Sequence, residues 1–309
     1  MKFAFFFPGQ GSQSVGMMQG LADIAVVRDT FTEASDILGQ DFWSMVTEPN
    51  EALNQTANTQ PLMLTAGVAT WRAWQQTSSL TPALMAGHSL GEYTALVAAG
   101  ALSFKDALPL VRYRAEVMQN AVAEGVGAMA AILGLDDDTV RQVCADAAQG
   151  EVVEAVNLNS PGQVVIAGNK AAVERGMELA KEKGAKRALA LPVSVPSHCA
   201  LMKPAATDLA QYLVSVSIGA SAIPVLHNAD VAAYNDADKI KDALVRQLFS
   251  PVRWVETVQK THQQGIVATA ECGPGKVLAG LTKRIVAELP CVALTNTDAL
   301  AEAKAQFSA

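Results

Sequence analysis

The chain has 309 residues, of which half are hydrophobic and 17% are charged, so it can bury a sizeable core and is not a mainly disordered chain. Its net charge of -7 argues against nucleic acid as the main partner. The four cysteines are far apart and form neither a Cys-x-x-Cys pair nor a Cys/His cluster. We therefore expect reduced thiols and no metal site.

The N-terminal stretch MKFAFFFPGQG holds one lysine and an apolar run that stops at Pro8 and Gly9. This run is too short for the core of a signal peptide or for a membrane span. It fits a buried strand over residues 2–7, followed by a loop. We therefore expect a soluble, cytoplasmic protein with no membrane contact.

Strands and helices alternate in the region that follows. Helical periodicity marks residues 60–76, and a short apolar strand is expected over residues 83–87. Two further helices are expected over residues 90–102 and 104–122, with Pro109 in the first turn of the second. This alternation predicts a mostly parallel sheet with helices on both faces.

The pattern changes at Gly125, where the expected order becomes strand, helix, strand, strand, helix, strand. That order is the ferredoxin-like βαββαβ unit. Its elements are expected over residues 127–135, 136–148, 151–159, 163–168, 169–184 and 186–194. We predict a small domain, residues 125–195, inserted into a larger α/β domain made of residues 1–124 and 196–309.

The larger domain resumes with the same alternation of helices and strands. Helices are expected over residues 201–216, 237–249, 252–265 and 275–289. A strand followed by a loop is expected over residues 223–230, and a strand over residues 266–273. The helix over residues 275–289 is the last element that the pattern indicates.

The stretch GHSLGEY, residues 87–93, sets Ser89 between two glycines, after an expected strand and before an expected helix. This is the setting of a nucleophile elbow, in which the serine takes a strained backbone conformation. Gly87 and Gly91 remove side chains that would clash with such a turn. The free N–H groups at the helix start can stabilise an oxyanion. The alternative is an ordinary Gly-rich turn with Ser89 as a helix N-cap.

A serine nucleophile needs a base, and the chain has four histidines. His198 is the first candidate, because it lies where the chain returns from the small domain and a cleft would form at that junction. His227, just after an expected strand, is the second. His88 would point away from Ser89, and His262 lies in a polar helix that we expect at the surface. No acidic residue is well placed as the third member of a triad.

Six stretches now point to one family: FPGQGSQ, GHSLGEY, VRYRAEVMQ, NSPGQVVIAG, PVSVPSHCALM and GPGKVL. In that order they closely resemble the malonyl-CoA:acyl-carrier-protein transacylases of bacterial type II fatty-acid synthesis. The resemblance runs from Phe3 to about Leu289. It implies an α/β-hydrolase-like large domain with a parallel sheet and a ferredoxin-like small domain.

The resemblance also implies roles for matching residues. Ser89 would be the nucleophile and His198 the base. The backbone carbonyl of Gln247 would orient the histidine in place of an acid, which would explain why no acid was found. Gln10 and Leu90 would supply backbone N–H groups to an oxyanion hole.

Arg114 would hold the free carboxylate of malonate, since a planar guanidinium binds a carboxylate with two hydrogen bonds. From the residues alone, a surface arginine beside Arg112 is the competing interpretation. Gln163, in the small domain, would line the cleft as a second substrate-binding residue. His227 stands where similar enzymes commonly carry a small polar residue or Asn, and it would alter the pH profile if it reached the cleft.

The implied reaction moves malonyl from coenzyme A to the phosphopantetheine thiol of acyl carrier protein, with ping-pong kinetics and no cofactor. We expect a monomer that serves fatty-acid synthesis. Three alternatives remain: the same chemistry serving polyketide synthesis, a serine hydrolase of acyl thioesters, and a non-catalytic module that binds a carrier protein.

Carrier proteins are typically acidic, so docking on this acidic chain needs a local basic patch. Lys181, Lys183, Lys186 and Arg187 form one candidate cluster in the small domain. Other candidates are Lys203, Lys283 and Arg284.

Overall fold

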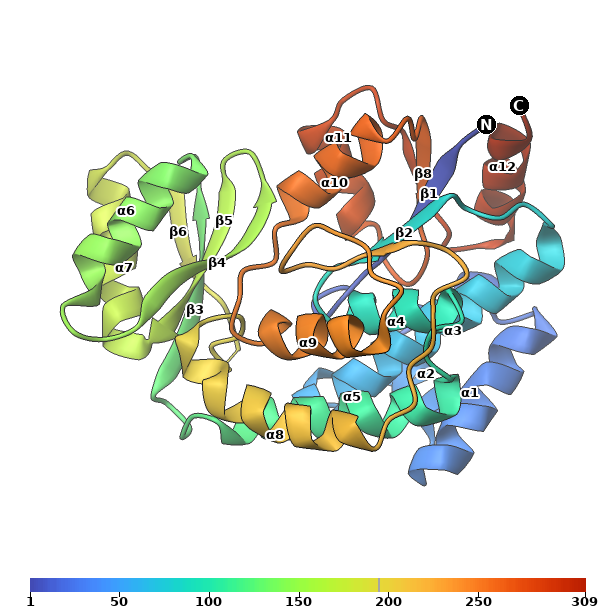
Figure 1. Ribbon diagram of the computed structural model, residues 1–309, viewed down its shortest axis with the longest axis horizontal. Helices are drawn as coiled ribbons and strands as arrows, with labels where there is room; N and C mark the ends of the chain where they lie inside the picture. The colour runs from blue at the N-terminus through green and yellow to red at the C-terminus, as the bar shows by residue number, and fades with distance from the viewer. Residues whose placement is uncertain (194) are drawn as a thin grey trace.

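A computed structural model describes residues 1–193 and 195–309, and its strands form two separate sheets (Figure 1). The larger sheet has five strands in the order β7-β2-β1-β8-β9, and every neighbouring pair is parallel. Its strands are β1 (Phe3–Phe7), β2 (Leu84–Gly87), β7 (Val225–Leu226), β8 (Ala268–Glu271) and β9 (Cys291–Ala293). The expectation of a parallel sheet is confirmed.

The central strand β1 shows why this sheet is covered on both faces. Phe3, Phe5 and Phe7 pack into one hydrophobic core, and Ala4 and Phe6 pack into another. Alternate residues of a strand point to opposite faces, so a continuous apolar run fits a strand with a core on each side. Helices α10 (Trp254–Gln263) and α11 (Val277–Ile285) contribute to the core that contains Phe6 (Figure 1).

The other core is built mainly from the remaining helices of this region. They are α1 (Ala25–Leu38), α2 (Phe42–Thr47), α3 (Thr56–Thr77), α4 (Gly91–Ala98), α5 (Phe104–Asn120), α8 (Lys203–Val214), α9 (Ala237–Gln247) and α12 (Thr297–Ser308). Short 3-10 turns occur at Gln19–Leu21, Ala52–Asn54 and Ala200–Met202.

Helices α4 and α5 differ in detail from the expectations. Helix α4 ends at Ala98, four residues early, and Gly100 follows with a φ of 76°. Pro109 is the sixth residue of α5 and does not lie in its first turn. Ser103 fixes the start of that helix upstream, because its side chain accepts a hydrogen bond from the Asp106 N–H.

The chain also continues past the last expected helix, with β9 and α12. Asn296 caps α12 by accepting a hydrogen bond from the Ala299 N–H at 2.8 Å. Phe307 of α12 stacks on Phe3 with ring centroids 4.3 Å apart, which joins the two ends of the chain. Figure 1 shows the termini close together.

The smaller sheet is antiparallel, with strand order β4-β5-β3-β6. Its elements are β3 (Gly127–Leu133), α6 (Asp137–Ala148), β4 (Val153–Ser160), β5 (Gln163–Asn169), α7 (Lys170–Glu182) and β6 (Arg187–Ala190). The expected order βαββαβ is confirmed. Strand β6 ends earlier than expected, and Ser194, the last residue of the strand expected over 186–194, lies outside the described residues.

Backbone hydrogen bonds join the two sheet regions. The Leu158 N–H donates to the Val252 carbonyl at 3.0 Å, and the Val252 N–H donates to the Val156 carbonyl at 2.8 Å. The segment before α10 is therefore held against β4. Within residues 1–193 and 195–309, no helix has the length and apolar content needed to cross a membrane.

Candidate active site

Ser89 lies on a sharp turn between β2 and α4, with a φ of 52°. A Cβ added to Gly87 would lie 1.9 Å from the Gly91 carbonyl carbon. One added to Gly91 would lie 2.0 Å from the Phe7 carbonyl oxygen. The glycines therefore let strand, turn and helix approach one another, and Ser89 carries the strain of the turn.

His198 lies against Ser89 although 109 residues separate them in sequence. Its Nε2 is 2.8 Å from the Ser89 Oγ, and its Nδ1 is 2.8 Å from the backbone carbonyl oxygen of Gln247. Because a carbonyl only accepts, Nδ1 carries the ring proton and Nε2 is free to accept the serine proton. The backbone φ of His198 is 67°, and its backbone N–H donates to the Leu248 carbonyl at 3.0 Å. These contacts fix the ring in an orientation suited to a base.

Burial controls the charge of this histidine. Burial, and then the positive charge of Arg114, lower the pKa of His198 from 6.5 to about 3. The hydrogen bond to Gln247 opposes the shift but does not outweigh it. The imidazole is therefore neutral near neutral pH, which is the form that can accept a proton.

Arg114, on α5, is only 1% exposed, so the surface interpretation is wrong. Its Nη1 donates to the Gln60 Oε1 at 2.7 Å, and its Nη2 donates to the Gln247 Oε1 at 2.9 Å. Nη2 is also 3.3 Å from the Ser89 Oγ. A guanidinium at this distance can reach a carboxylate on an acyl group attached to the serine.

A cavity of about 510 Å³ opens over Ser89, Arg114 and His198. It is lined by segments of both sheet regions: Gln10, Gly11, Gln13, Asn54, Thr56, Gln60, His88, Ser89, Leu90, Arg114, Met118, Met129, Asn157, Leu191, Pro192, Val193, Val195, Ser197 and His198. Within residues 1–193 and 195–309, neither the Gln10 nor the Leu90 backbone N–H has an acceptor. Both are therefore free to bind an oxyanion.

The structure brings together Ser89, His198, Arg114 and Gln247, with Gln10 and Leu90 beside them. Gln163 is not among the described residues that line the cavity, since it opens β5 at the hairpin turn.

The other three histidines differ in where they lie relative to the cavity. His227 is buried behind Ser89 and away from the cavity, with its Nδ1 2.7 Å from the Glu92 Oε1, so the idea that it reaches the cleft is wrong. His88 lines the cavity, with its Nε2 2.8 Å from the Asn159 Oδ1. His262 is partly exposed, with its Nδ1 3.3 Å from the Ile266 carbonyl.

Sequence reasoning missed two buried residues beside the serine, Glu92 and Asn228. The Ser89 N–H donates to the Asn228 Oδ1 at 2.7 Å, and the Asn228 Nδ2 donates to the Gly87 carbonyl at 2.6 Å. Asn228 follows β7, the parallel neighbour of β2, and parallel strands present functional groups at their carboxyl ends. The position of Asn228 just after a parallel strand is a signal in the sequence that could have identified it.

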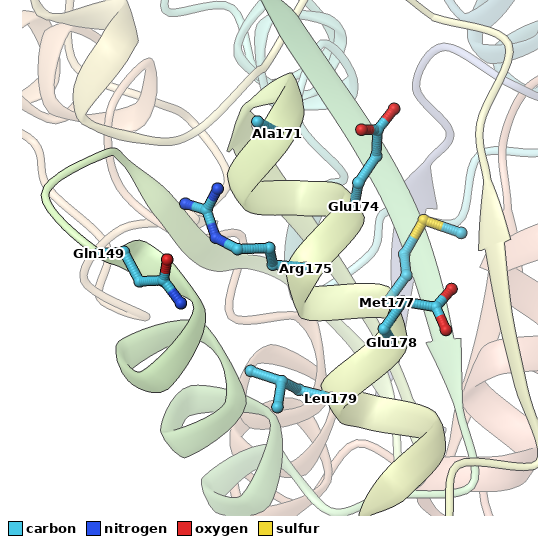
Figure 2. Close-up of a pocket in the computed structure, with 7 residues that line it drawn as sticks. All are labelled: Gln149, Ala171, Glu174, Arg175, Met177, Glu178 and Leu179. Carbon is cyan, nitrogen blue, oxygen red and sulfur yellow. The ribbon is translucent and has the colours of Figure 1, made fainter.

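A larger hollow, of about 710 Å³, lies along α7 on the smaller sheet region. Figure 2 shows Arg175 extending from α7 toward Gln149, at the end of α6. Arg175 is already bound, because it donates to the carbonyls of Ala147 and Ala148 and to Glu151. None of the described lining residues is a serine, cysteine or histidine.

No group of three His, Cys, Asp or Glu side chains within the described parts of the chain could hold a metal ion. The protein groups around Ser89 are a hydroxyl, a neutral imidazole, a guanidinium and two free N–H groups. Together they suit the transfer of an acidic acyl group.

The chain belongs to the acyl transferase family, because the family model "Acyl transferase domain" matches residues 4–296. It is 56% identical over 307 residues to the malonyl CoA-acyl carrier protein transacylase of Salmonella typhimurium, which covers 99% of each chain.

Solved structures agree with this assignment. The acyl-carrier-protein S-malonyltransferase of Burkholderia pseudomallei is 61% identical, with a TM-score of 0.97 over 99% of this chain and 100% of that one. A malonyl-transacylase in complex with its type II PKS acyl-carrier protein is 54% identical, with a TM-score of 0.97 over the same shares.

Proposed function

We propose that this chain moves the malonyl group from malonyl-CoA to the phosphopantetheine thiol of acyl carrier protein, through a malonyl ester on Ser89. The observation that carries this proposal is the Arg114 Nη2 lying 3.3 Å from the same Oγ that lies 2.8 Å from the His198 Nε2. A nucleophile with its base thus adjoins a receptor for a carboxylate. The names of the relatives support the same substrate and acceptor.

The first half of the reaction forms the ester. The Ser89 Oγ attacks the thioester carbonyl and its proton passes to the His198 Nε2, while the Gln10 and Leu90 N–H groups bind the oxyanion. The carbon–sulfur bond breaks, and coenzyme A leaves with the proton from His198. In the second half the carrier thiol attacks the ester, and Ser89 recovers its proton by the reverse route.

Arg114 has two effects in this scheme. It holds the carboxylate of malonyl, and its charge also lowers the pKa of His198. Binding of the malonyl carboxylate offsets that charge, so the imidazole becomes a better base once the correct acyl group is bound. The Gln247 carbonyl then stabilises the imidazolium that forms, because it accepts from Nδ1.

The finer features of the fold and setting are also proposals. We infer an α/β-hydrolase-like domain, residues 1–124 and 196–309, with an inserted ferredoxin-like domain, residues 125–195. The antiparallel order β4-β5-β3-β6 with α6 and α7 supports the second name. We propose a cytoplasmic monomer that serves fatty-acid synthesis.

The cluster of Lys181, Lys183, Lys186 and Arg187, which we call the basic cluster, is our proposed docking surface for the acidic carrier protein. All four residues are exposed, as are Lys203, Lys283 and Arg284. Charge complementarity supports this assignment.

A second candidate function is the same transfer for a polyketide synthase. The similarity to a malonyl-transacylase in complex with a type II PKS acyl-carrier protein favours it. The two functions differ only in the carrier, so the kcat/KM for each type of carrier protein distinguishes them.

The test is product analysis after the chain is mixed with malonyl-CoA and a carrier protein that bears phosphopantetheine. We expect malonyl-carrier protein, with little free malonate. Free malonate as the main product would indicate a hydrolase, and no turnover would indicate a module that only binds the carrier.

A further inference from the structure

Glu92 is a fully buried carboxylate that the mechanism above does not use. It lies in the first turn of α4, three residues after Ser89, and is 0% exposed. Its Oε1 is 2.7 Å from the His227 Nδ1. Its Oε2 accepts from the Asn228 N–H at 2.8 Å and from the Gln247 Nε2 at 2.9 Å. Burying a carboxylate is costly even when three donors bind it. A carboxylate buried beside the nucleophile therefore suggests a function.

The hydrogen bonds of Gln247 decide which way its side-chain amide points. The Gln247 Nε2 donates to Glu92 and to the Ser89 carbonyl, the latter at 3.0 Å, while its Oε1 accepts from the Arg114 Nη2 at 2.9 Å. In the flipped amide, the oxygen would face two acceptors and the NH2 group would face the guanidinium, which only donates. Glu92 and the Ser89 carbonyl together therefore keep the Gln247 oxygen directed at Arg114.

The Glu92 side chain does not itself make the other contacts of the reacting groups. The Asn228 side chain holds the Ser89 N–H and the Gly87 carbonyl directly. His198 is held by backbone carbonyls, of Gln247 and of Leu248. Loss of the Glu92 carboxylate therefore acts on the Gln247 amide and, through it, on Arg114, and it also removes the acceptor of the Asn228 N–H.

We propose that Glu92 is a positioning residue, which orients the Arg114 guanidinium for the malonyl carboxylate by fixing the amide of Gln247. This inference rests on the proposed function, because it concerns recognition of that acyl group. It gives Glu92 a role in acyl-group selection and leaves the reaction at Ser89 to the groups already described.

The test compares an acyl donor that has a free carboxylate with one that lacks it. Malonyl-CoA is the first, and the acetyl group of p-nitrophenyl acetate is the second, with nitrophenolate release reporting acylation of Ser89. In Glu92→Leu the side chain keeps its approximate volume but accepts no hydrogen bond. We expect kcat/KM for malonyl-CoA to fall roughly tenfold or more, and nitrophenolate release to change by less than about threefold.

Glu92→Gln is the matched conservative variant. Its amide oxygen can accept from Asn228 and Gln247, and its NH2 group can donate to the His227 Nδ1 if that ring moves its proton to Nε2. In the described parts of the chain, His227 Nε2 has no partner that would oppose this change. We expect this variant to recover malonyl transfer to within about threefold of wild type, since the hydrogen bonds are restored.

Glu92→Met is the second variant, and it tests the proposal if Glu92→Leu fails to fold. Its unbranched side chain can fill the same space and its thioether accepts hydrogen bonds only weakly, so we expect the same malonyl-selective loss. An equal fall with both donors, or no loss with malonyl-CoA, would overturn the role of Glu92. Failure of the wild-type chain to transfer malonyl at all would instead reject the proposed function.

Discussion

Two polar regions of this molecule differ sharply in how they are held. In the active-site cluster, which comprises Ser89, Arg114, His198 and Gln247, hydrogen bonds of 2.8 to 3.3 Å link side chains that are almost entirely buried apart from Ser89. In the basic cluster every residue is exposed, and Lys181 pairs with Glu178 while both side chains are at least half exposed. The first region acts through fixed geometry, and the second can act only through its charge.

Removing the base should give the largest effect among the changes that leave the nucleophile in place. General-base catalysis typically contributes about 10²–10⁴-fold, so we expect His198→Ala to lower kcat/KM for malonyl-CoA by that order. Steady-state transfer to the carrier protein measures it. His262→Ala, a change to a partly exposed histidine, is the control and should retain activity. A loss below about tenfold in His198→Ala would show that another group takes the proton.

Arg114→Lys should give the next largest effect, because it keeps the positive charge and loses the planar fork. We expect kcat/KM for malonyl-CoA to fall roughly 10- to 100-fold, with nitrophenolate release from p-nitrophenyl acetate nearly preserved. Arg112→Lys changes a neighbouring arginine of the same helix, which hydrogen-bonds to Gln40, and serves as the matched control. Equal losses with both acyl donors would contradict a specific role in carboxylate binding.

The pH dependence follows from the pKa of His198, which burial and Arg114 lower to about 3. A base with a depressed pKa stays neutral as the pH falls, so the acidic limb of kcat/KM should lie well below 6.5. The unfolded chain binds this proton below about 6.5 whereas the folded chain does not, so the same shift destabilises the fold as the pH falls. Circular dichroism at each pH separates the two effects. An acidic limb near 6.5 in folded protein would contradict a buried imidazole.

The basic cluster should give the smallest effect. Exchanging Lys181, Lys183, Lys186 and Arg187 for Gln should raise the KM for the carrier protein several-fold, because each exposed ion pair contributes about 1 kcal/mol or less to binding. The exchange should also make this KM less dependent on salt concentration. The rate of Ser89 acylation by malonyl-CoA should not change. The pair Lys283 and Arg284, exchanged in the same way, is the comparison. If carrier binding is insensitive to salt in every variant, electrostatic docking is wrong.

Local patterns were sufficient for the elbow and for the order of elements in the smaller sheet. The glycines around Ser89 are required because side chains there would clash with nearby backbone atoms. The glycine spacing therefore predicts the elbow from the sequence alone. Strand β9 has only three residues, all half-buried, and gave no periodic signal. The pattern of α12 was also missed, although Asn296 marks its start.

Long-range contacts explain what the sequence could not provide. Glu92 and the Asn228 N–H are 136 positions apart, and Gln247 is 155 positions from Glu92. From the residues alone, a surface position was the favoured interpretation of Arg114, and the resemblance to a known family favoured a role in carboxylate binding instead. Its burial depends on α3, α9 and the elbow meeting around α5, which no local pattern records.

The central claim is that Ser89 carries the malonyl group, and intact mass after mixing the protein with malonyl-CoA tests it most directly. We predict that the wild-type chain gains the mass of one malonyl group and loses it when carrier protein with phosphopantetheine is added, and that Ser89→Ala gains nothing. A Ser89→Ala chain that gains the same mass, or a wild-type chain that transfers malonyl without ever carrying it, would contradict the account.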